Sequence, residues 1–398
     1  MSDKYISIGK KVSGFSFANL GLILGFGGSV ISAIYSLVLL DIFGNPAIVG
    51  LYVSAYFVFA MCVALFASEV FRRVSKARLM HACFLLSGIF FFMMSFPIAP
   101  ATFIVFDLLT GVTLILLGLL MPLFMADFSH GVGMQKLNAR YWFWINLGSL
   151  VAPMLALSIA SEFGLRVPFA IAAMIYLCGL LLFRNMKIVQ MDKKVTAFRP
   201  SRTLRVVYRN MRIFFRRHAF AKAYFVMFCN YIQISLRNIY VPIMVIQNDV
   251  ALFGLSLEKT LGLLITCMIV PYLLLSQPMG YLARKYGSRL WLTIGFLTYA
   301  GFAIWASFAS GYWLLLIFVL WHIPGAFIEP LRDLLFFDAS TKTERQRFWG
   351  LFRTSTMVAR IIAPLIAAMI IFAFGGIGAI WIFVAAVSLL AAMVLLKK

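Results

Sequence analysis

The sequence has 398 residues, of which 63% are hydrophobic and only 12% are charged. This composition excludes a soluble globular domain and is typical of a multi-pass membrane protein. The formal net charge of +22 would suit a nucleic-acid-binding protein. Because the cations lie at the ends of apolar segments, we interpret the charge as topological and expect no nucleic-acid partner.

Apolar runs long enough to cross a bilayer as helices recur along the whole chain. The runs are continuous and do not alternate in polarity, which argues against a β-barrel. We therefore predict an all-α polytopic membrane protein with about twelve transmembrane helices. The expected spans are 15–43, 47–68, 79–98, 101–126, 141–161, 167–183, 220–246, 257–279, 290–309, 312–337, 349–373 and 376–396.

Lysines and arginines fall almost entirely on one side of this alternating topology. They include Lys10, Arg72, Lys136, Arg284 and Lys397, whereas the other side carries little beyond Arg166 and Lys259. By the positive-inside rule, both termini are expected in the cytoplasm. We predict that the protein lies in the cytoplasmic (inner) membrane.

The most basic stretch divides the chain into three parts. Residues 1–185 are expected to form an N-terminal six-helix bundle, 186–219 a basic cytoplasmic linker, and 220–398 a C-terminal six-helix bundle. The two bundles are related by an internal repeat, and six spans per repeat make the repeats parallel. Three pairs of similar residues are each 211 positions apart: Asp127 and Asp338, Lys136 and Arg347, and Pro153 and Pro364.

The linker contains a predicted amphipathic helix that begins near Pro200. Its arginines recur at helical spacing, and apolar side chains occupy the other side. The helix could lie on anionic membrane lipids of the cytoplasmic leaflet. Alternatively, it is a topological anchor and hinge between the two bundles, and the positive-inside rule favours this second interpretation. The cations are Arg202, Arg205, Arg209, Arg212 and Arg216.

Two opposite charges lie deep in consecutive apolar segments near the end of the chain. Glu329 is about 14 Å of helical rise from Asp338, and Arg360 is about 15 Å from Gly350. We therefore expect the two charges to meet near the membrane midplane. Alternation between pairing with Arg360 and binding a proton or substrate would make Glu329 a coupling residue. The alternative is a permanent structural bridge, which we favour less because buried ion pairs seldom add net stability.

The expected seventh span carries a polar stripe with helical periodicity. Asn230, Gln233, Arg237 and Tyr240 recur at i, i+3, i+7 and i+10. Such a stripe on an apolar helix is expected to face a substrate cavity. For Arg237, attraction of an anionic group and snorkelling to the outer interface are equally compatible with the sequence.

Two further polar residues are candidates for lining this cavity. Asn146 lies in the fifth expected span, and His322 follows Trp321 in the tenth. Cys229 could approach His322, but two ligands without a carboxylate make a poor metal site. We expect no metal and no cofactor.

The loop GYLARKYGSR resembles the G-x-L-A-D-R-x-G-R-R loop of the major facilitator superfamily. Gly280, Gly287 and Arg289 match, whereas Arg284 stands where the family has Asp. The later sequence RDLLFFDASTKTERQRFWGLFRT resembles the segment joining the tenth and eleventh helices of many bacterial members. The resemblance implies two six-helix bundles around a central path and a cytoplasmic gate. The gate residues that it implies are Arg332, Asp333, Asp338 and Arg353, together with the loop residues Gly280, Arg284, Gly287 and Arg289.

The function that this resemblance implies is secondary active transport by alternating access. Polar groups concentrate in the second half, so we expect a small amphiphilic or lipophilic organic solute and favour proton-coupled export by a monomer. Uptake of an anionic metabolite is the alternative. The degenerate motifs also suit a membrane scaffold or sensor that does not transport. The chain carries no cluster of catalytic residues, so we do not expect an enzyme.

Overall fold

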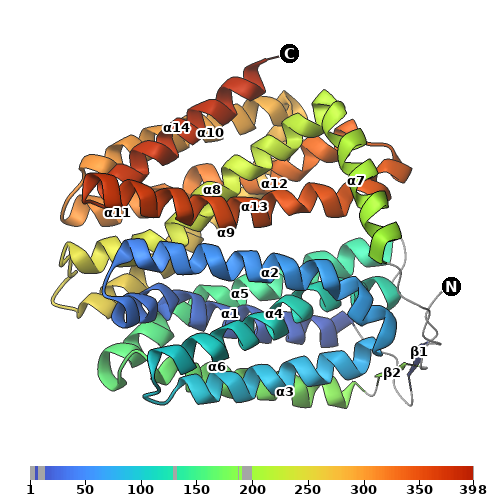
Figure 1. Cartoon of the computed structure of the whole chain (residues 1–398). Coiled ribbons are helices and arrows are strands. Elements are labelled where there is room, and N and C mark those ends of the chain that lie inside the picture. Colours follow the sequence, from blue (N-terminus) through green and yellow to red (C-terminus); the bar gives the residue numbers. More distant parts are fainter. Residues whose placement is uncertain (1–4, 8–13, 129–131, 187, 191–199, 398) are drawn as a thin grey trace. The chain divides into compact units, whose positions relative to one another are not determined.

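The computed structural model describes residues 5–7, 14–128, 132–186, 188–190 and 200–397, and for some residues within these ranges it describes only the backbone. Nearly all of the described chain is helical, because a helix satisfies every backbone polar group without water (Figure 1). The first helices are α1 (Gly14–Phe43), α2 (Pro46–Arg73), α3 (Lys76–Met94), α4 (Pro100–Phe128), α5 (Val132–Phe163) and α6 (Val167–Asn185).

The remaining helices follow in the second half of the chain. They are α7 (Pro200–Arg216), α8 (His218–Gln247), α9 (Leu257–Tyr286), α10 (Ser288–Phe308), α11 (Tyr312–Leu320), α12 (His322–Ala339), α13 (Lys342–Phe374) and α14 (Gly378–Leu396). One short antiparallel sheet, which the sequence did not predict, pairs β1 (Tyr5–Ser7) with β2 (Ile188–Gln190).

The helices confirm the predicted all-α membrane fold. Among the described residues, ten helical segments are long and apolar enough to span a membrane, and α11 and α12 together form one of them. The two 30-residue helices α8 and α9 are not among the ten. Helix α8 carries Asn230, Gln233 and Arg237, which lower its hydropathy. The count of twelve spans and the position of the termini therefore stay predictions.

The chain divides into two compact units. Unit 1 contains residues 1–38 and 58–198, and unit 2 contains residues 39–57 and 199–398. The end of α1 and the beginning of α2 thus belong to unit 2, although most of both helices belongs to unit 1.

Unit 1 is held together by close approaches between helices. Where Gly25 of α1 meets α5, a Cβ would lie 2.7 Å from the Cα of Ile145, so only glycine fits without a shift. Gly148 of α5 approaches the carbonyl of Leu22 in the same way. Helices α3 and α4 are joined by a 2.6 Å hydrogen bond between the hydroxyls of Ser87 and Thr113. Small residues therefore allow the backbones of this unit to pack closely.

Unit 2 contains a helix break that its sequence explains. Helix α11 ends at Leu320 and α12 begins at His322. Pro324 has no N–H to donate to the carbonyl of Leu320, and its ring crowds that carbonyl. The break places Trp321 in the core, where its ring centre lies 5.2 Å from that of Trp381 on α14.

Helix α7 lies across the ends of α8 and α13 (Figure 1) and covers the stretch where the sequence predicts an amphipathic helix. Arg347 of α13 donates two hydrogen bonds to the side-chain oxygen of Asn210, at 2.9 and 2.7 Å. Phe214 is fully buried among aromatic rings of unit 2. These rings belong to Phe215, Phe220, Tyr224, Phe336 and Phe348.

The first and last residues of some helices show the same 211-residue offset as the internal repeat in the sequence. Helix α14 begins and ends 211 residues after α6, since 378−167 and 396−185 are both 211. Pro153 lies inside α5 and Pro364 lies inside α13, again 211 residues apart. A duplicated set of helices explains this regularity.

Candidate functional site

The polar stripe of α8 contacts several different neighbours. Asn230 accepts a hydrogen bond on Oδ1 from the guanidinium of Arg332 on α12. Gln233 donates from Nε2 to the hydroxyl of Ser388 on α14 at 2.7 Å. Asn230 and Gln233 are both almost fully buried. The stripe is thus divided between two helix interfaces of unit 2, and its expected cavity-lining role stays a prediction.

Tyr240, one helical turn beyond Arg237, occupies a third interface. Its hydroxyl lies where a Cβ on Gly50 of α2 would stand, and the same Cβ would be 2.8 Å from the carbonyl oxygen of Pro364 on α13. The hydroxyl is buried and makes no hydrogen bond to any described residue. Arg237 is half-buried and donates from Nε to Asn238 at 3.4 Å.

Tyr231 of α8 lies between two arginines, an arrangement that the sequence did not predict. Arg332 donates from Nη2 to the Tyr231 hydroxyl at 3.1 Å, and its guanidinium carbon lies 4.7 Å from the centre of the Tyr231 ring. The guanidinium carbon of Arg360 lies 5.6 Å from the same ring centre and 5.3 Å from that of Phe57. We call Asn230, Tyr231, Arg332 and Arg360 the arginine–tyrosine cluster.

The arginine–tyrosine cluster is rich in hydrogen-bond donors. A guanidinium has five N–H donors and no acceptor. The Oδ1 of Asn230 is already occupied by Arg332, and its Nδ2 is buried without a hydrogen-bond partner among the described residues. Since the Tyr231 hydroxyl accepts from Arg332, its own proton can be donated elsewhere. The cluster therefore suits a group that accepts hydrogen bonds and carries negative charge.

Glu329 lies on α12, three residues before Arg332 and four before Asp333, and it is half-buried. The contacts described for Arg360 are with the rings of Phe57 and Tyr231. The expected ion pair between Glu329 and Arg360 is not among these contacts and stays a prediction.

The residues of the predicted gate fall into separate places. Asp333 and Arg353 come together, with 4.0 Å between Oδ1 and Nη1, and the Arg353 guanidinium also lies over the ring of Trp349. Asp338 is exposed near the end of α12. Gly280 and Arg284 belong to α9, but the Arg284 side chain lies outside the described part of the structure. Their gating role stays a prediction.

Arg289 instead contacts the end of the last helix. Its Nε donates to the carbonyl of Leu395 on α14, and Lys222 of α8 donates to the carbonyl of Lys397 at 2.6 Å. Cations at a helix C-terminus satisfy carbonyls that have no partner within the helix. Gly287 precedes α10 with a φ of 91°, which favours glycine.

His322 is buried, and its Nδ1 lies 3.1 Å from the carbonyl oxygen of Phe318, one turn earlier. Among the residues that the structure describes, no group of three or more His, Cys, Asp or Glu side chains could hold a metal ion. Asn146 is half-buried on α5 of unit 1, and its substrate-binding role stays a prediction.

Unit 1 contains a buried carboxylate with a hydroxyl partner. Tyr35 of α1 donates to Oδ2 of Asp107 on α4 at 2.7 Å, and Asp107 is 6% exposed. Both residues are visible in the sequence as polar groups in apolar segments. Their pairing is not, because 72 residues separate them.

Helices long and apolar enough to span a membrane, with buried polar clusters between them, are features of a multi-pass membrane protein. The sequence profile of the Major Facilitator Superfamily matches residues 17–257 and 223–398, and the chain belongs to this superfamily. It is a transporter and not an enzyme. No curated protein matches the chain significantly.

Several solved transporter structures share the fold. The nucleoside transporter NupG has 13% identity and a TM-score of 0.74, with 97% of this chain and 99% of that chain covered. A D-xylose–proton symporter has 16% identity and a TM-score of 0.74, with 96% of both chains covered. A POT family transporter in complex with 5-aminolevulinic acid has 13% identity and a TM-score of 0.76, with 96% and 95% covered.

Proposed function

We propose that the protein is a secondary transporter that exports a small amphiphilic or lipophilic organic solute across the cytoplasmic membrane in exchange for protons. The observation that carries this proposal is the arginine–tyrosine cluster inside apolar helices of unit 2. Ionisable groups within membrane-spanning segments are costly and are retained for substrate or ion binding. The charged groups would hold the polar head of the solute, and apolar helices would contact its body.

We propose Glu329 as the residue that carries the coupling proton. It is a half-buried carboxylate on α12, one helical turn before Arg332. During the cycle it would alternate between a protonated form and a form paired with Arg360. The solved structures that share this fold include a D-xylose–proton symporter.

Reconstituted vesicles with an imposed pH gradient test this proposal. Movement of rhodamine 123, a lipophilic cation, and of carboxyfluorescein, an organic anion, would be followed by fluorescence. Wild-type protein should drive at least one dye against its gradient, and Glu329→Gln should abolish the pH-driven part. Asp249→Asn is the matched control, because Asp249 is exposed outside the cluster and its φ of 50° is acceptable for Asn.

Flux that is equal in the wild type and Glu329→Gln would contradict the assigned proton carrier. If wild-type vesicles moved neither dye nor any other solute, the non-transporting scaffold or sensor would be favoured. Uptake of an anionic metabolite is the second candidate function, because two arginines flank Tyr231. The direction of pH-driven flux distinguishes uptake from export.

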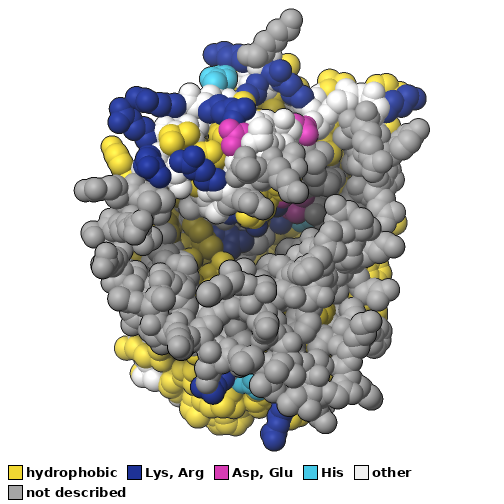
Figure 2. Space-filling view, turned by 90° about the vertical axis from the view of Figure 1, so that its right-hand side faces the viewer, with side chains coloured by type: hydrophobic (Ala, Val, Ile, Leu, Met, Phe, Trp, Pro, Cys, Tyr) yellow, Lys and Arg dark blue, Asp and Glu magenta, His cyan; other side chains and the backbone are white. Residues whose placement is uncertain are grey.

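We also propose that α7 lies on anionic lipids at the cytoplasmic surface and that the transporter acts as a monomer. Arg209, Arg212 and Arg216 are exposed on α7, and the apolar side chains of Met211 and Phe215 are exposed beside them. Lysines and arginines gather at the end of unit 2 that carries α7 (Figure 2). An amphipathic helix with this composition binds anionic lipid surfaces.

A further inference from the structure

Arg360 of α13 is a half-buried cation whose described contacts are with aromatic rings. Its contacts are the rings of Phe57 and Tyr231, and no described residue forms an ion pair with it. A cation over an aromatic ring gains about 0.5–2 kcal/mol. This is less than the several kcal/mol that it costs to remove an ion from water. A guanidinium in this setting is therefore available to an anionic group of a ligand.

Arg332 differs from Arg360 because the chain itself fixes its position. Asn230 and Tyr231 both accept hydrogen bonds from its guanidinium, which orients it on the α8 side of α12. The guanidinium carbon of Arg332 also lies 4.7 Å from the centre of the Tyr231 ring. The Tyr231 ring thus lies close to two positively charged groups, the guanidiniums of Arg332 and Arg360. Arg332 is a positioning residue, and Arg360 is the residue that remains able to bind a ligand.

The uncharged groups of the cluster point to the same ligand chemistry. Nδ2 of Asn230 is a buried donor without a hydrogen-bond partner among the described residues. The proton of the Tyr231 hydroxyl is available because the hydroxyl oxygen accepts from Arg332. Both groups contact the same guanidinium, so these donors lie within one small region. A ligand that satisfies them must offer several acceptor atoms on one head group.

We infer that the arginine–tyrosine cluster binds the head group of an organic anion, such as a carboxylate, sulfonate or phosphate ester, with Arg360 making the direct contact. An apolar part of the ligand next to the head would lie near the Phe57 ring, which is in contact with the same guanidinium. An amine would meet the two positive charges of Arg332 and Arg360. The inference rests on the proposed transport function and names the substrate class of that site.

Ligands that share a phenyl group and differ in their head group test the head-group chemistry. The full chain would be placed in nanodiscs of phosphatidylcholine, and Tm would be measured with 4-phenylbutyrate, phenyl phosphate, 4-phenylbutanol or 4-phenylbutylamine. A ligand that binds only the folded state raises Tm. We expect the two anions to raise the Tm of the wild type, and the alcohol and the amine to leave it unchanged.

Three variants assign the effect to the cluster. Arg360→Gln should weaken anion binding at least tenfold, whereas Arg360→Lys, which keeps the charge, should retain part of it. Tyr231→Phe keeps the ring under both arginines and removes the hydroxyl, so binding should weaken severalfold. Arg166→Gln is the control, because Arg166 contacts backbone carbonyls of Phe96 and Ile98 in unit 1, and it should give the full anion shift.

A lipid phosphate and a free anion share this chemistry, and a second nanodisc series separates them. If phosphatidylglycerol occupies the cluster, adding it should raise the Tm of the wild type more than that of Arg360→Gln and should abolish the phenylbutyrate shift. If a free anion is the ligand, the phenylbutyrate shift should persist in phosphatidylglycerol.

The inference is overturned if neither anion raises the wild-type Tm. It is equally overturned if the amine or the alcohol matches the anions, or if Arg360→Gln keeps the full shift. An anion-specific shift without flux of any solute would contradict transport and leave the binding site standing. Flux of the cationic dye that depends on Glu329, without an anion shift, would support transport and refute the anion site.

Discussion

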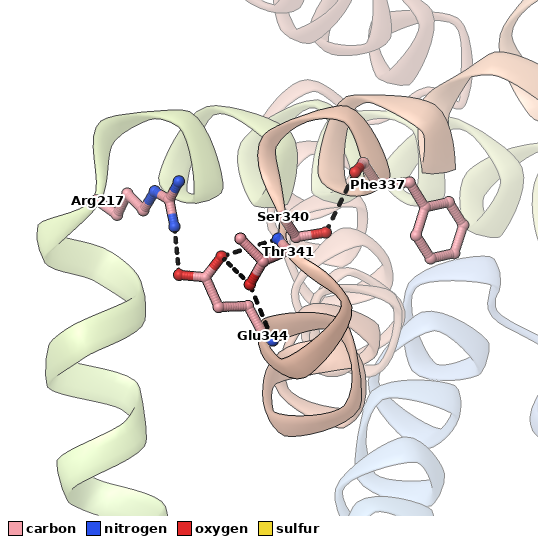
Figure 3. Close-up of polar contacts among 5 residues, drawn as sticks. All are labelled: Arg217, Phe337, Ser340, Thr341 and Glu344. Atoms are coloured by element: carbon pink, nitrogen blue, oxygen red, sulfur yellow. Dashed lines mark hydrogen bonds and ion pairs between the residues drawn. The ribbon is translucent and has the colours of Figure 1, made fainter.

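Arg217, the residue that precedes α8, forms an ion pair with Glu344 in the first turn of α13, with 2.5 Å between Nη1 and Oε1 (Figure 3). Glu344 simultaneously caps its own helix: its carboxylate accepts a hydrogen bond from the backbone N–H of Thr341 at 2.9 Å, and its N–H donates to the Thr341 hydroxyl. This reciprocal arrangement is a capping box, which satisfies donors at a helix start. The start of α13 is thereby tied to the α7–α8 junction.

The first prediction concerns the pH dependence of this junction. Hydrogen bonds from Thr341, and to a lesser extent the charge of Arg217, hold the pKa of Glu344 below its ordinary value of 4.5. A carboxylate with a depressed folded-state pKa stabilises the protein above its unfolded pKa and loses this contribution as the pH falls through the folded value. Glu344→Gln should therefore lower Tm at pH 7, and the difference from the wild type should shrink below about pH 4.5.

The measurement is thermal unfolding in detergent between pH 7 and the lowest pH at which the wild type stays folded. Asp338→Asn serves as the control, because Asp338 is an exposed acidic residue outside the capping box. A Tm difference between Glu344→Gln and the wild type that is constant over the whole range would refute the prediction.

A second prediction compares two glycines on α1. Gly25→Ala would push a methyl group into the backbone of Ile145 on α5, so it should destabilise the protein by about 1–3 kcal/mol. Gly28, three residues later, has open space around its Cβ position. Gly28→Ala should be neutral or stabilise by up to about 1 kcal/mol through helix propensity. Thermal unfolding of both variants checks this, and equal effects would show that α1 and α5 do not pack closely there.

The third prediction tests the buried carboxylate of unit 1. Tyr35→Phe keeps the ring but removes the hydroxyl that donates to Asp107. Removing one partner of a buried hydrogen bond costs about 1–3 kcal/mol, so a loss of that size is expected in the free energy of unfolding. Tyr312→Phe is the control, since Tyr312 is 65% exposed. If both variants had the same free energy of unfolding, the hydrogen bond between Tyr35 and Asp107 would not stabilise the protein.

A fourth prediction concerns the attachment of α7 to unit 2. Asn210→Ala removes the acceptor of two hydrogen bonds from Arg347, so α7 should detach more often. Trypsin should then cleave after Arg212 severalfold faster than in the wild type, as followed by mass spectrometry. Met211→Ala changes an exposed neighbour and should leave the cleavage rate unchanged. Unaltered cleavage of Asn210→Ala would mean that these bonds do not hold the helix.

The helical fold was predictable because the bilayer restricts a spanning chain to few solutions. Long apolar runs must form helices in lipid, and the offset that joins Pro153 to Pro364 reappears in the bounds of α6 and α14. The β1–β2 pair was not predicted, since three-residue strands carry no periodic signal.

The partners of the polar residues were harder to predict than their positions. Helical periodicity places Asn230 and Gln233 on one stripe, but it does not say that one contacts α12 and the other α14. Tyr231 lies off that stripe, and its importance comes from two arginines that are 101 and 129 positions away (332−231 and 360−231). Such contacts depend on helix packing, which the pattern of one helix does not encode.

The assignment of residues 39–57 to unit 2 has a mechanical consequence. The unit boundaries fall between Val38 and Leu39 within α1 and between Phe57 and Val58 within α2, where the helices run without interruption. Any displacement of one unit against the other must bend α1 and α2 at these points or separate residues 39–57 from Tyr240 and Arg360. Bending of α1 and α2 would thus take up part of any such displacement.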